Sequence, residues 1–292
     1  MEEQKTIIAL IQLLEDPDEN IYQHVYNQLL IIGTKVIPIL ETSWELDVKS
    51  LEHQHRIENL IRDIQFSTRK NELLEWKKSE DKDLISAWVI LSKWKYPGLN
   101  SSIINEKIDC IKQDIWLEIN DNQTAYEKIK ILNKIFFQHY KFKGNHNNYH
   151  SPLNSFINTV IETKQGNPLS LSILYSYISQ KLNIPIYGVN LPNHFVLAYL
   201  DENKVNHLIG NESKSGVLFY INAFSNGSIL YEDDIKTFLK QLKIGENHSY
   251  FEPCGNTTII QRIIINLIST YQSLGNQELV NELLEFKEIL IS

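Results

Sequence analysis

A helix start in the middle of the chain is the first place where chemistry is expected. In "KQGNPLSLSILY" (164–175), Gly166 breaks the preceding segment, Asn167 is a favourable N-cap residue and Pro168 suits the first helical position. The start of a helix stabilises negative charge, and enzymes use it to lower the pKa of a nucleophilic cysteine. This stretch has no cysteine, and Ser170 in the first turn is the nearest candidate. A serine becomes a nucleophile only beside an aligned base.

A histidine-containing loop precedes this helix start. The segment "GNHNNYH" (144–150) places His146 and His150 four residues apart, and His194 and His207 follow later in the chain. A zinc site needs three or four converging ligands, and neither a cysteine pair nor an HExxH pattern supports one here. We therefore predict no metal and no cofactor, and expect a polar loop that could shape the rim of a cleft.

The composition limits the class of protein. With 292 residues, 42% hydrophobic residues and a net charge of −8, the chain is long enough for about two domains and is an unpromising partner for nucleic acid. No apolar run approaches the ~18–20 residues that cross a bilayer, and the start "MEEQKTIIALIQLLED" is acidic where a secretory signal is basic. We predict a cytoplasmic protein without a membrane partner. Cys110 and Cys254 are expected to be buried thiols rather than a disulfide.

Residues 1–95 carry helical periodicity throughout. The segment "DPD" (16–18) indicates a turn and a helix start, and a helix pair with "DPD" in its turn and "IPIL" after a glycine resembles one HEAT repeat. No second copy follows at a fixed period, so a solenoid is not expected. The break "KWKYPGLN" (93–100) predicts a boundary at the end of this helical domain. Helices are predicted within it over 51–64, 69–77 and 82–93.

The rest of the chain predicts an α+β fold. Apolar residues recur at helical spacing over 168–182, and three β-branched and aromatic segments with short connections predict antiparallel strands. The last segment reads as two amphipathic helices about a Gly275-Asn276 turn, similar to a tetratricopeptide hairpin. The predicted strands are 184–191, 194–200 and 216–224, and the other helices are 101–119, 124–139 and 232–242. The domains follow as 1–95 helical, 96–245 core and 246–292 hairpin.

The segment "NSFINTVIETKQGNPLSLSILYSYISQKLNIPIYGVNLPNHFVLAYLD" (154–201) resembles the SirB-type branch of the transglutaminase-like superfamily. The pattern G-N-P-L-S-L followed by V-N-L-P-x-H-F carries the resemblance, and "LFYINAFSNGSIL" (218–230) continues it in order. The resemblance implies a core helix packed on a small antiparallel sheet, as in papain and the transglutaminases. In active members a cysteine begins that helix, a histidine lies on a following strand and an aspartate on the next.

The resemblance assigns these three places to Pro168, His194 and Asn222. Proline cannot attack a carbonyl, so the preferred hypothesis is a degenerate, non-catalytic core that binds a protein or peptide partner. The alternative is a hydrolase or acyl transferase with Ser170 as nucleophile, His194 as base and Asn222 orienting the histidine. The geometry of Ser170 and of the cleft discriminates between them. A hydroxyl that caps its own helix beside a cleft filled by side chains favours the first hypothesis. A hydroxyl within reach of His194, with backbone N–H groups aimed at a common point, favours the second.

Overall fold

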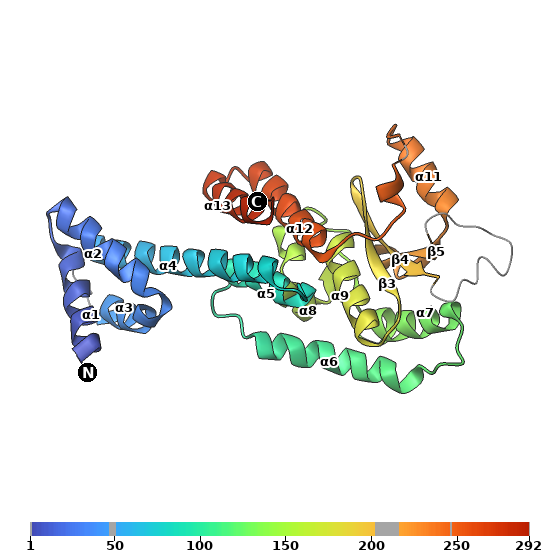
Figure 1. Ribbon diagram of the computed structural model, residues 1–292, viewed down its shortest axis with the longest axis horizontal. Helices are drawn as coiled ribbons and strands as arrows, with labels where there is room; N and C mark the ends of the chain where they lie inside the picture. Colours follow the sequence, from blue (N-terminus) through green and yellow to red (C-terminus); the bar gives the residue numbers. More distant parts are fainter. Residues whose placement is uncertain (1, 47–50, 202–215, 246, 292) are drawn as a thin grey trace. The chain divides into compact units, whose positions relative to one another are not determined.

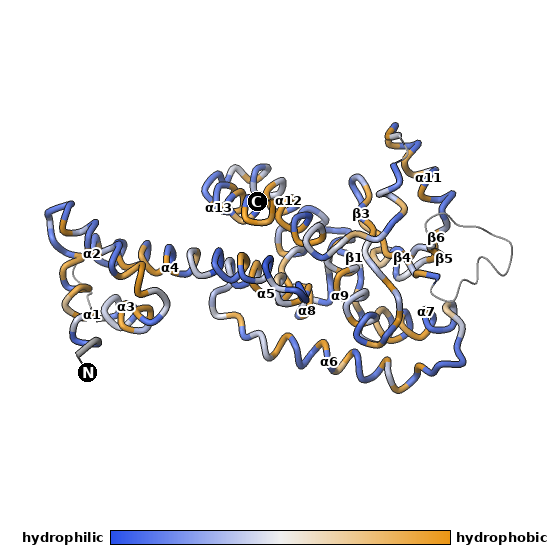
Figure 2. Tube along the Cα trace, in the orientation of Figure 1, coloured by the Kyte–Doolittle hydropathy of each residue, from blue (hydrophilic) through white to orange (hydrophobic). Residues whose placement is uncertain are grey.

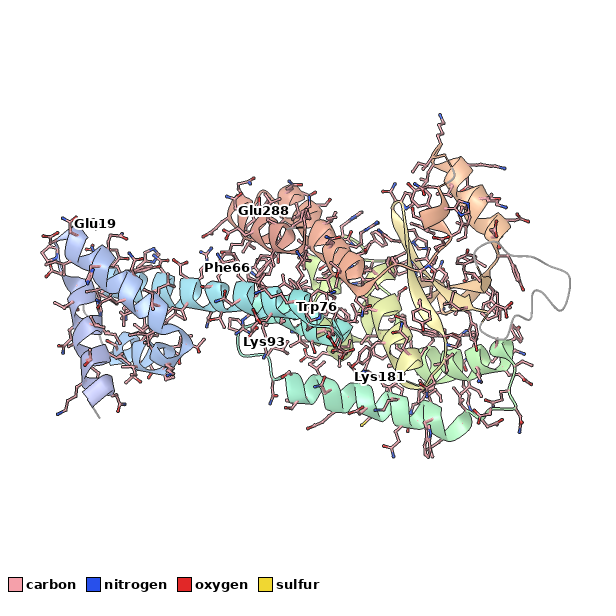
Figure 3. All side chains as sticks on the ribbon, in the orientation of Figure 1. Glu19, Phe66, Trp76, Lys93, Lys181 and Glu288 are labelled. Atoms are coloured by element: carbon pink, nitrogen blue, oxygen red, sulfur yellow. The ribbon has the colours of Figure 1, made fainter. Side chains whose placement is uncertain are left out.

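The computed structural model describes residues 2–46, 51–201, 216–245 and 247–291 (Figure 1). These residues divide into two compact units, one made of 1–75 with 93–97 and the other of 76–92 with 98–292. Trp76 and Lys181, both labelled in Figure 3, belong to the second unit. The predicted α+β class is confirmed, with a helical N-terminal region, a small antiparallel sheet and a C-terminal helix pair. His207 lies outside the described residues.

The first unit is helical. Asp18 caps its second helix by accepting a hydrogen bond from Asn20 N at 2.9 Å, and Gly33, with φ +77°, ends the same helix. Its buried side chains recur at helical spacing and form one apolar cluster, with Leu14, Leu29 and Leu40 fully inaccessible. Its helices are α1 (Glu2–Gln12), η1 (Leu13–Glu15), α2 (Glu19–Ile32), η2 (Gly33–Val36), α3 (Ile37–Leu46) and the first part of α4 (Leu51–Lys78).

The second unit contains the remaining helices, apart from residues 93–95, which belong to the first unit. Residues 124–139 form an α-helix that widens into a π-helical turn, and this turn places Phe136 and Phe137 against Tyr175. The helices are α5 (Leu84–Lys95), α6 (Ser101–Glu118), α7 (Ala125–Asn133), the π-helical turn η3 (Lys134–His139), η4 (Pro152–Ser155), α8 (Ile157–Thr163), α9 (Pro168–Lys181), η5 (Ala223–Ser225), α11 (Glu232–Gln241), η6 (His248–Tyr250), α12 (Asn256–Ser273) and α13 (Gln277–Ile291).

Two sheets accompany these helices. The larger one has the strand order β3-β4-β5-β6, all antiparallel, and pairs Leu191 with His194 across the turn between its first two strands. The smaller one is a parallel pair that joins Gly144 to Gly166. The strands are β1 (Lys143–Gly144), β2 (Gln165–Gly166), β3 (Ile186–Leu191), β4 (His194–Leu200), β5 (Val217–Asn222) and β6 (Ser228–Leu230).

Helices cover both faces of the larger sheet. The central helix α9 packs against β3 and β4, and nearly all of its side chains are buried. On the other face, Val196 and Ala198 of β4 share an apolar cluster with Ile235 and Leu239 of α11. Figure 1 draws the strands between these two helices. Because side chains alternate along a strand, each residue of β4 is assigned to the α9 face or the α11 face.

The helices at the surface of the second unit each bury one apolar face. In Figure 2, α6 alternates between hydrophobic and hydrophilic residues along its length, and its isoleucines 104, 108, 111 and 115 are buried. Cys110 lies on the other side of this helix and is exposed, so the prediction of a buried thiol there is wrong; Cys254 is half-buried. Among the described helices, none is both long and apolar enough to cross a membrane.

Candidate functional site

The N-terminus of α9 is closed by its own side chains. Ser170 N donates to Asn167 Oδ1 at 2.9 Å, and Asn167 N donates to Ser170 Oγ at 3.0 Å, which is a reciprocal capping pair. The Ser170 side chain is buried at 2% exposure, and its hydroxyl donates to Asn167 O at 3.2 Å. Pro168 occupies the first helical position, where no N–H is needed. The Ser170 hydroxyl is therefore engaged in hydrogen bonds within the first turn of α9.

Close packing around the start of α9 also holds the Ser170 hydroxyl in this position. A Cβ added to Gly166 would lie 2.4 Å from Ser170 Oγ, so only glycine leaves room for the hydroxyl. The Asn167 amide also donates to Ser155 Oγ at 3.2 Å, and Ser155 O accepts a hydrogen bond from Trp88 Nε1 at 2.7 Å. These bonds fix the helix start to the segment before α8.

The histidine-containing loop is ordered by asparagines. Asn145 donates to Asn154 Oδ1 at 2.9 Å, and Asn154 donates to the carbonyls of Asn148 and Tyr149. His146 packs against Phe224, with ring centroids 4.4 Å apart. His146 thus contacts η5, whereas Tyr149 and His150 at the end of the loop line a pocket.

His194 begins β4 and takes its place from the strand register. Alternation puts it on the face of Val196 and Ala198, and its ring centroid lies 5.8 Å from that of Phe238 on α11. Within the described residues, no hydrogen bond joins His194 to Ser170. The distance test for a serine–base pair is therefore not met in this conformation.

Asn222 ends β5 and serves as a cap. Its Oδ1 accepts hydrogen bonds from Phe224 N at 3.1 Å and Ser225 N at 3.3 Å. The described part of the chain contains no hydrogen bond from Asn222 to His194. Of the three predicted site residues, Ser170 and Asn222 each stabilise a local turn, and only His194 lines the pocket.

A pocket of about 360 Å³ opens beside the start of α9. Pro168 and His194, which the resemblance assigned to the nucleophile and base, both line it. Ser170 and Asn222 do not appear among the lining residues that the structure describes. Its walls come from the loop, the α9 start, the β3–β4 turn and α12, namely Tyr149, His150, Ser151, Ser155, Asn167, Pro168, Leu169, Asn193, His194, Phe195, Arg262, Asn266, Ser269 and Thr270.

Arg262 is the residue that sequence reasoning missed. Its Nη1 donates to Asn190 Oδ1 at 2.8 Å and to Leu191 O at 3.1 Å, and its Nε donates to Asn266 Oδ1 at 3.3 Å. These bonds hold the guanidinium against the β3–β4 turn. The signal in the sequence was its isolation, because Arg262 is the one charged residue between Glu252 and Glu278.

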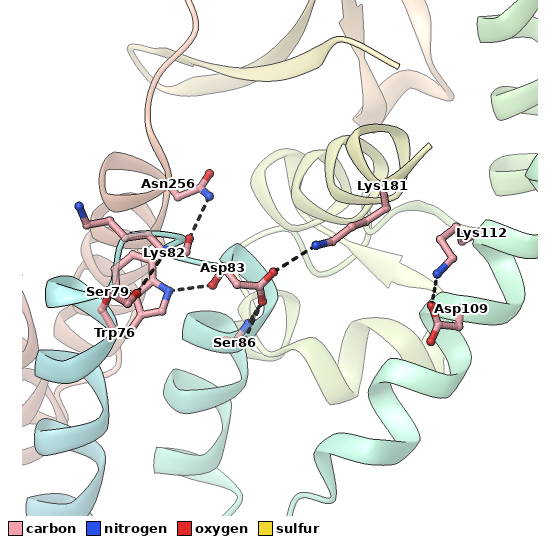
Figure 4. A network of polar contacts seen from close by, with 9 residues as sticks. All are labelled: Trp76, Ser79, Lys82, Asp83, Ser86, Asp109, Lys112, Lys181 and Asn256. Carbon is pink, nitrogen blue, oxygen red and sulfur yellow. Dashed lines mark hydrogen bonds and ion pairs between the residues drawn. The ribbon is translucent and has the colours of Figure 1, made fainter. Parts of the chain in front are cut away.

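Contacts at the start of α12 fix this helix to the rest of the second unit (Figure 4). Asn256 Nδ2 donates to Lys82 O at 3.0 Å, and Trp76 Nε1 donates to Asp83 O at 2.7 Å in the same turn. Lys181 at the end of α9 forms an ion pair with Asp83 at 3.9 Å. The turn between α4 and α5 therefore ties the helix that carries Arg262 to the helix that carries Pro168.

The electrostatics of the pocket favour a neutral histidine. Burial lowers the pKa of His194, and the nearby Arg262 guanidinium lowers it further. Burial also lowers the pKa of Arg262 from its usual value. Close by, burial raises the pKa of the Cys254 thiol to about 11, which leaves it protonated at neutral pH and unreactive as a nucleophile.

No metal centre emerges from the described side chains: they contain no cluster of three or more His, Cys, Asp or Glu residues that could hold an ion. His150 and His194 line the same pocket, and His146 packs on Phe224 instead.

Comparison with known proteins identifies the fold family of this core. The family model of the transglutaminase-like superfamily matches residues 103–265, and the chain therefore belongs to that superfamily. The matched range runs into α12 and includes Arg262. No solved structure matches the chain.

Curated relatives share this core at low identity. A UPF0162 protein of Xylella fastidiosa strain 9a5c is 26% identical over 194 residues, which cover 64% of each chain. The F-box only protein 21 of Mus musculus is 27% identical over 154 residues, or 52% of this chain and 22% of that protein. A UPF0162 protein of Pasteurella multocida is 35% identical over 88 residues, 30% of this chain and 33% of that protein. The chain spans less than two thirds of these relatives.

Proposed function

We propose that this protein is a non-catalytic member of the transglutaminase-like superfamily whose pocket binds a peptide segment of a partner protein. The observation that carries the proposal is the reciprocal pair between Ser170 and Asn167, which uses the hydroxyl of the alternative nucleophile, Ser170, as a helix cap. Pro168 adds to this argument because it supplies no nucleophile at the wall of the pocket. The pocket itself stays open, with room for a few side chains.

The alternative, a hydrolase or acyl transferase that uses Ser170 with His194, has less support. The hydroxyl is buried, bonded within its own turn and set back from the pocket lining. Nucleophilic catalysis needs the serine and its base within hydrogen-bond reach, and a committed cap would have to break first. Cys254 does not offer a substitute, because its thiol stays protonated at neutral pH.

Three finer assignments accompany the proposal and rest on sequence resemblance. These are the SirB-type branch, the HEAT-like character of residues 1–95 and the tetratricopeptide-like character of the hairpin 246–292. The cytoplasmic location stays a prediction.

Two measurements test the proposal. A serine-directed acylating probe is applied to the wild type and to Ser170→Ala and His194→Ala; we expect no labelling of any of them. Labelling that disappears in both variants would establish the enzyme and overturn the proposal. In parallel, a synthetic library of random hexapeptides with free termini is passed over the immobilised protein, and the retained peptides are identified by mass spectrometry.

A pocket-filling variant assigns the peptides to the site. Ser269→Trp puts an indole into the pocket, whereas Ser273→Trp places the same side chain one turn further along α12 at an exposed position outside the described lining. We expect Ser269→Trp to lose the retained peptides and Ser273→Trp to keep them. Equal retention by both variants, or no retention by the wild type, would contradict peptide binding in this pocket.

A further inference from the structure

The guanidinium of Arg262 has no charge partner among the described residues. Within the described residues its hydrogen bonds go to neutral oxygens, those of Asn190, Leu191 and Asn266, and they use Nη1 and Nε. Arginine has five N–H donors, so the two on Nη2 have no acceptor within the described residues. No acidic side chain that the structure describes forms an ion pair with Arg262. A half-buried cation is thus held in a fixed orientation with donors to spare.

The residues around Arg262 favour the binding of a negatively charged ligand group. The chain has 36 acidic residues, yet no Asp or Glu stands among the described residues that line the pocket. Burying a cation without a counter-charge costs free energy, which a bound anion recovers. The pocket adds the imidazole of His194 and the hydroxyl of Ser269 as further polar groups. Although the net charge of the chain is −8, the described lining of this pocket contains an arginine and no carboxylate.

The start of α9 narrows the choice of anion. Phosphate sites at helix starts use the first backbone amides as donors. Here Pro168 has no amide hydrogen, and the Ser170 amide is already bonded to Asn167 at 2.9 Å. Among the first three residues of α9, only the Leu169 amide has no acceptor within the described residues, so the helix start offers too few donors for a phosphate, and Nη2 of Arg262 supplies the charged donors of the pocket.

We infer that the pocket recognises a carboxylate of its peptide ligand through Nη2 of Arg262, with His194 as a second donor. The inference rests on the proposed function and names the group by which the peptide is held. A free C-terminus and an acidic side chain both supply this group, and the two are separated by the probes below.

The experiment uses the full chain and small peptides followed by NMR. The probes are N-acetyl-Ala-Ala with a free C-terminus, its C-terminal amide, and N-acetyl-Ala-Glu-amide, which carries the carboxylate on a side chain. The reporter is the ring signal of His194, assigned by its absence in His194→Gln. We expect saturable binding of at least one acid and at least tenfold weaker binding of the neutral amide.

Variants of α12 and α13 supply the controls. Arg262→Gln should weaken binding of the acid at least tenfold, and Lys287→Gln, which removes one positive charge from α13 outside the described pocket lining, should leave it unchanged. Arg262→Lys, which keeps the charge but loses the planar fork, should fall between the two. Thermal melting confirms that each variant is folded.

Three results would overturn the inference. These are equal affinity for acid and amide, an Arg262→Gln variant that binds as well as the wild type, and inorganic phosphate binding more tightly than either acid. If library peptides bind the pocket but acid and amide do not differ, only the carboxylate inference fails. If neither the library nor these probes bind, the proposed function fails with it.

Discussion

Ser170 and Asn167 hold each other across the first turn of α9, through hydrogen bonds of 2.9 and 3.0 Å that run in opposite directions. In a fold where this turn is the expected place for a nucleophile, the pair uses the serine to complete the helix start. Because these two hydrogen bonds stabilise the start of α9, the role of Ser170 can be measured as a change in the free energy of unfolding.

Replacing Ser170 with alanine should cost stability and leave peptide binding intact. The substitution leaves Asn167 N without its acceptor, and the loss of a capping partner costs about 1 kcal/mol. The measurement is the free energy of unfolding from urea denaturation, with Ser273→Ala on the exposed side of α12 as the matched control. A Ser170→Ala variant as stable as the control would contradict the capping role.

Two glycines with the same backbone angle should respond differently to alanine. Gly227 and Gly275 have φ of +73° and +72°, and for both the left-handed conformation costs an alanine about 1–2 kcal/mol. A Cβ on Gly227 would lie 2.0 Å from Asn133 Oδ1, whereas nothing lies within 4 Å of the corresponding atom on Gly275.

Asn133 is the reason why an alanine at position 227 should destabilise the protein more than one at position 275. It donates to Gly227 O at 2.9 Å and accepts from the hydroxyl of the buried Tyr175 at 2.9 Å. Displacing it leaves that hydroxyl unpaired, so Gly227→Ala should cost about 1–3 kcal/mol more than Gly275→Ala. Thermal unfolding of the two variants checks this difference, and equal losses would show that only the backbone angle matters.

Removing the charge of Arg262 should raise the pKa of His194. The guanidinium disfavours protonation of the imidazole, so Arg262→Gln takes away one of the two causes that lower its pKa, while burial remains. An NMR titration of the His194 ring measures the change. The Lys287→Gln control should not move the titration midpoint, and a midpoint that falls in Arg262→Gln would show that the two groups do not interact as described.

The lowered pKa of His194 predicts the direction of a pH effect on stability. Well above the unfolded value of about 6.5, both folded and unfolded states carry a neutral imidazole and the histidine contributes nothing. As the pH falls below that value, the unfolded state binds a proton that the folded state resists, so stability decreases.

His194→Gln should therefore lose less stability on acidification than the wild type. The difference between their melting temperatures is expected to shift in favour of the variant between pH 8 and pH 5, with His248→Gln at an exposed position as the control. A difference that stays constant over this range would contradict the buried neutral histidine.

Local signals in the sequence were sufficient for most elements of the second unit. Asn167 and Pro168 mark the start of α9, and β-branched and aromatic residues mark β3, β4 and β5. The predicted break between 64 and 69 is absent, since α4 runs without interruption from Leu51 to Lys78. No glycine or proline lies in that interval. The spacing of the apolar residues changes there, but the helix continues.

The site was harder to predict because its partners are far apart in the chain. Arg262 reaches Asn190 across 72 positions, and no local pattern specifies that contact. Arg262 falls within the predicted hairpin 246–292, whereas the pocket brings α12 together with the start of α9. The short strand β6 was also missed, because its three residues carry too little pattern to recognise.

Pro168 makes the pocket accessible to covalent trapping. A proline at the first helical position gives no hydrogen bond, so another residue can replace it without breaking one, and the N–H it brings is among those that begin every helix unpaired. In a Cys110→Ser background, which removes the exposed natural thiol, Pro168→Cys would place a reactive thiol at the pocket wall. A photoreactive crosslinker attached there would capture the molecule that occupies the pocket, and Pro168 would become the means of finding the ligand.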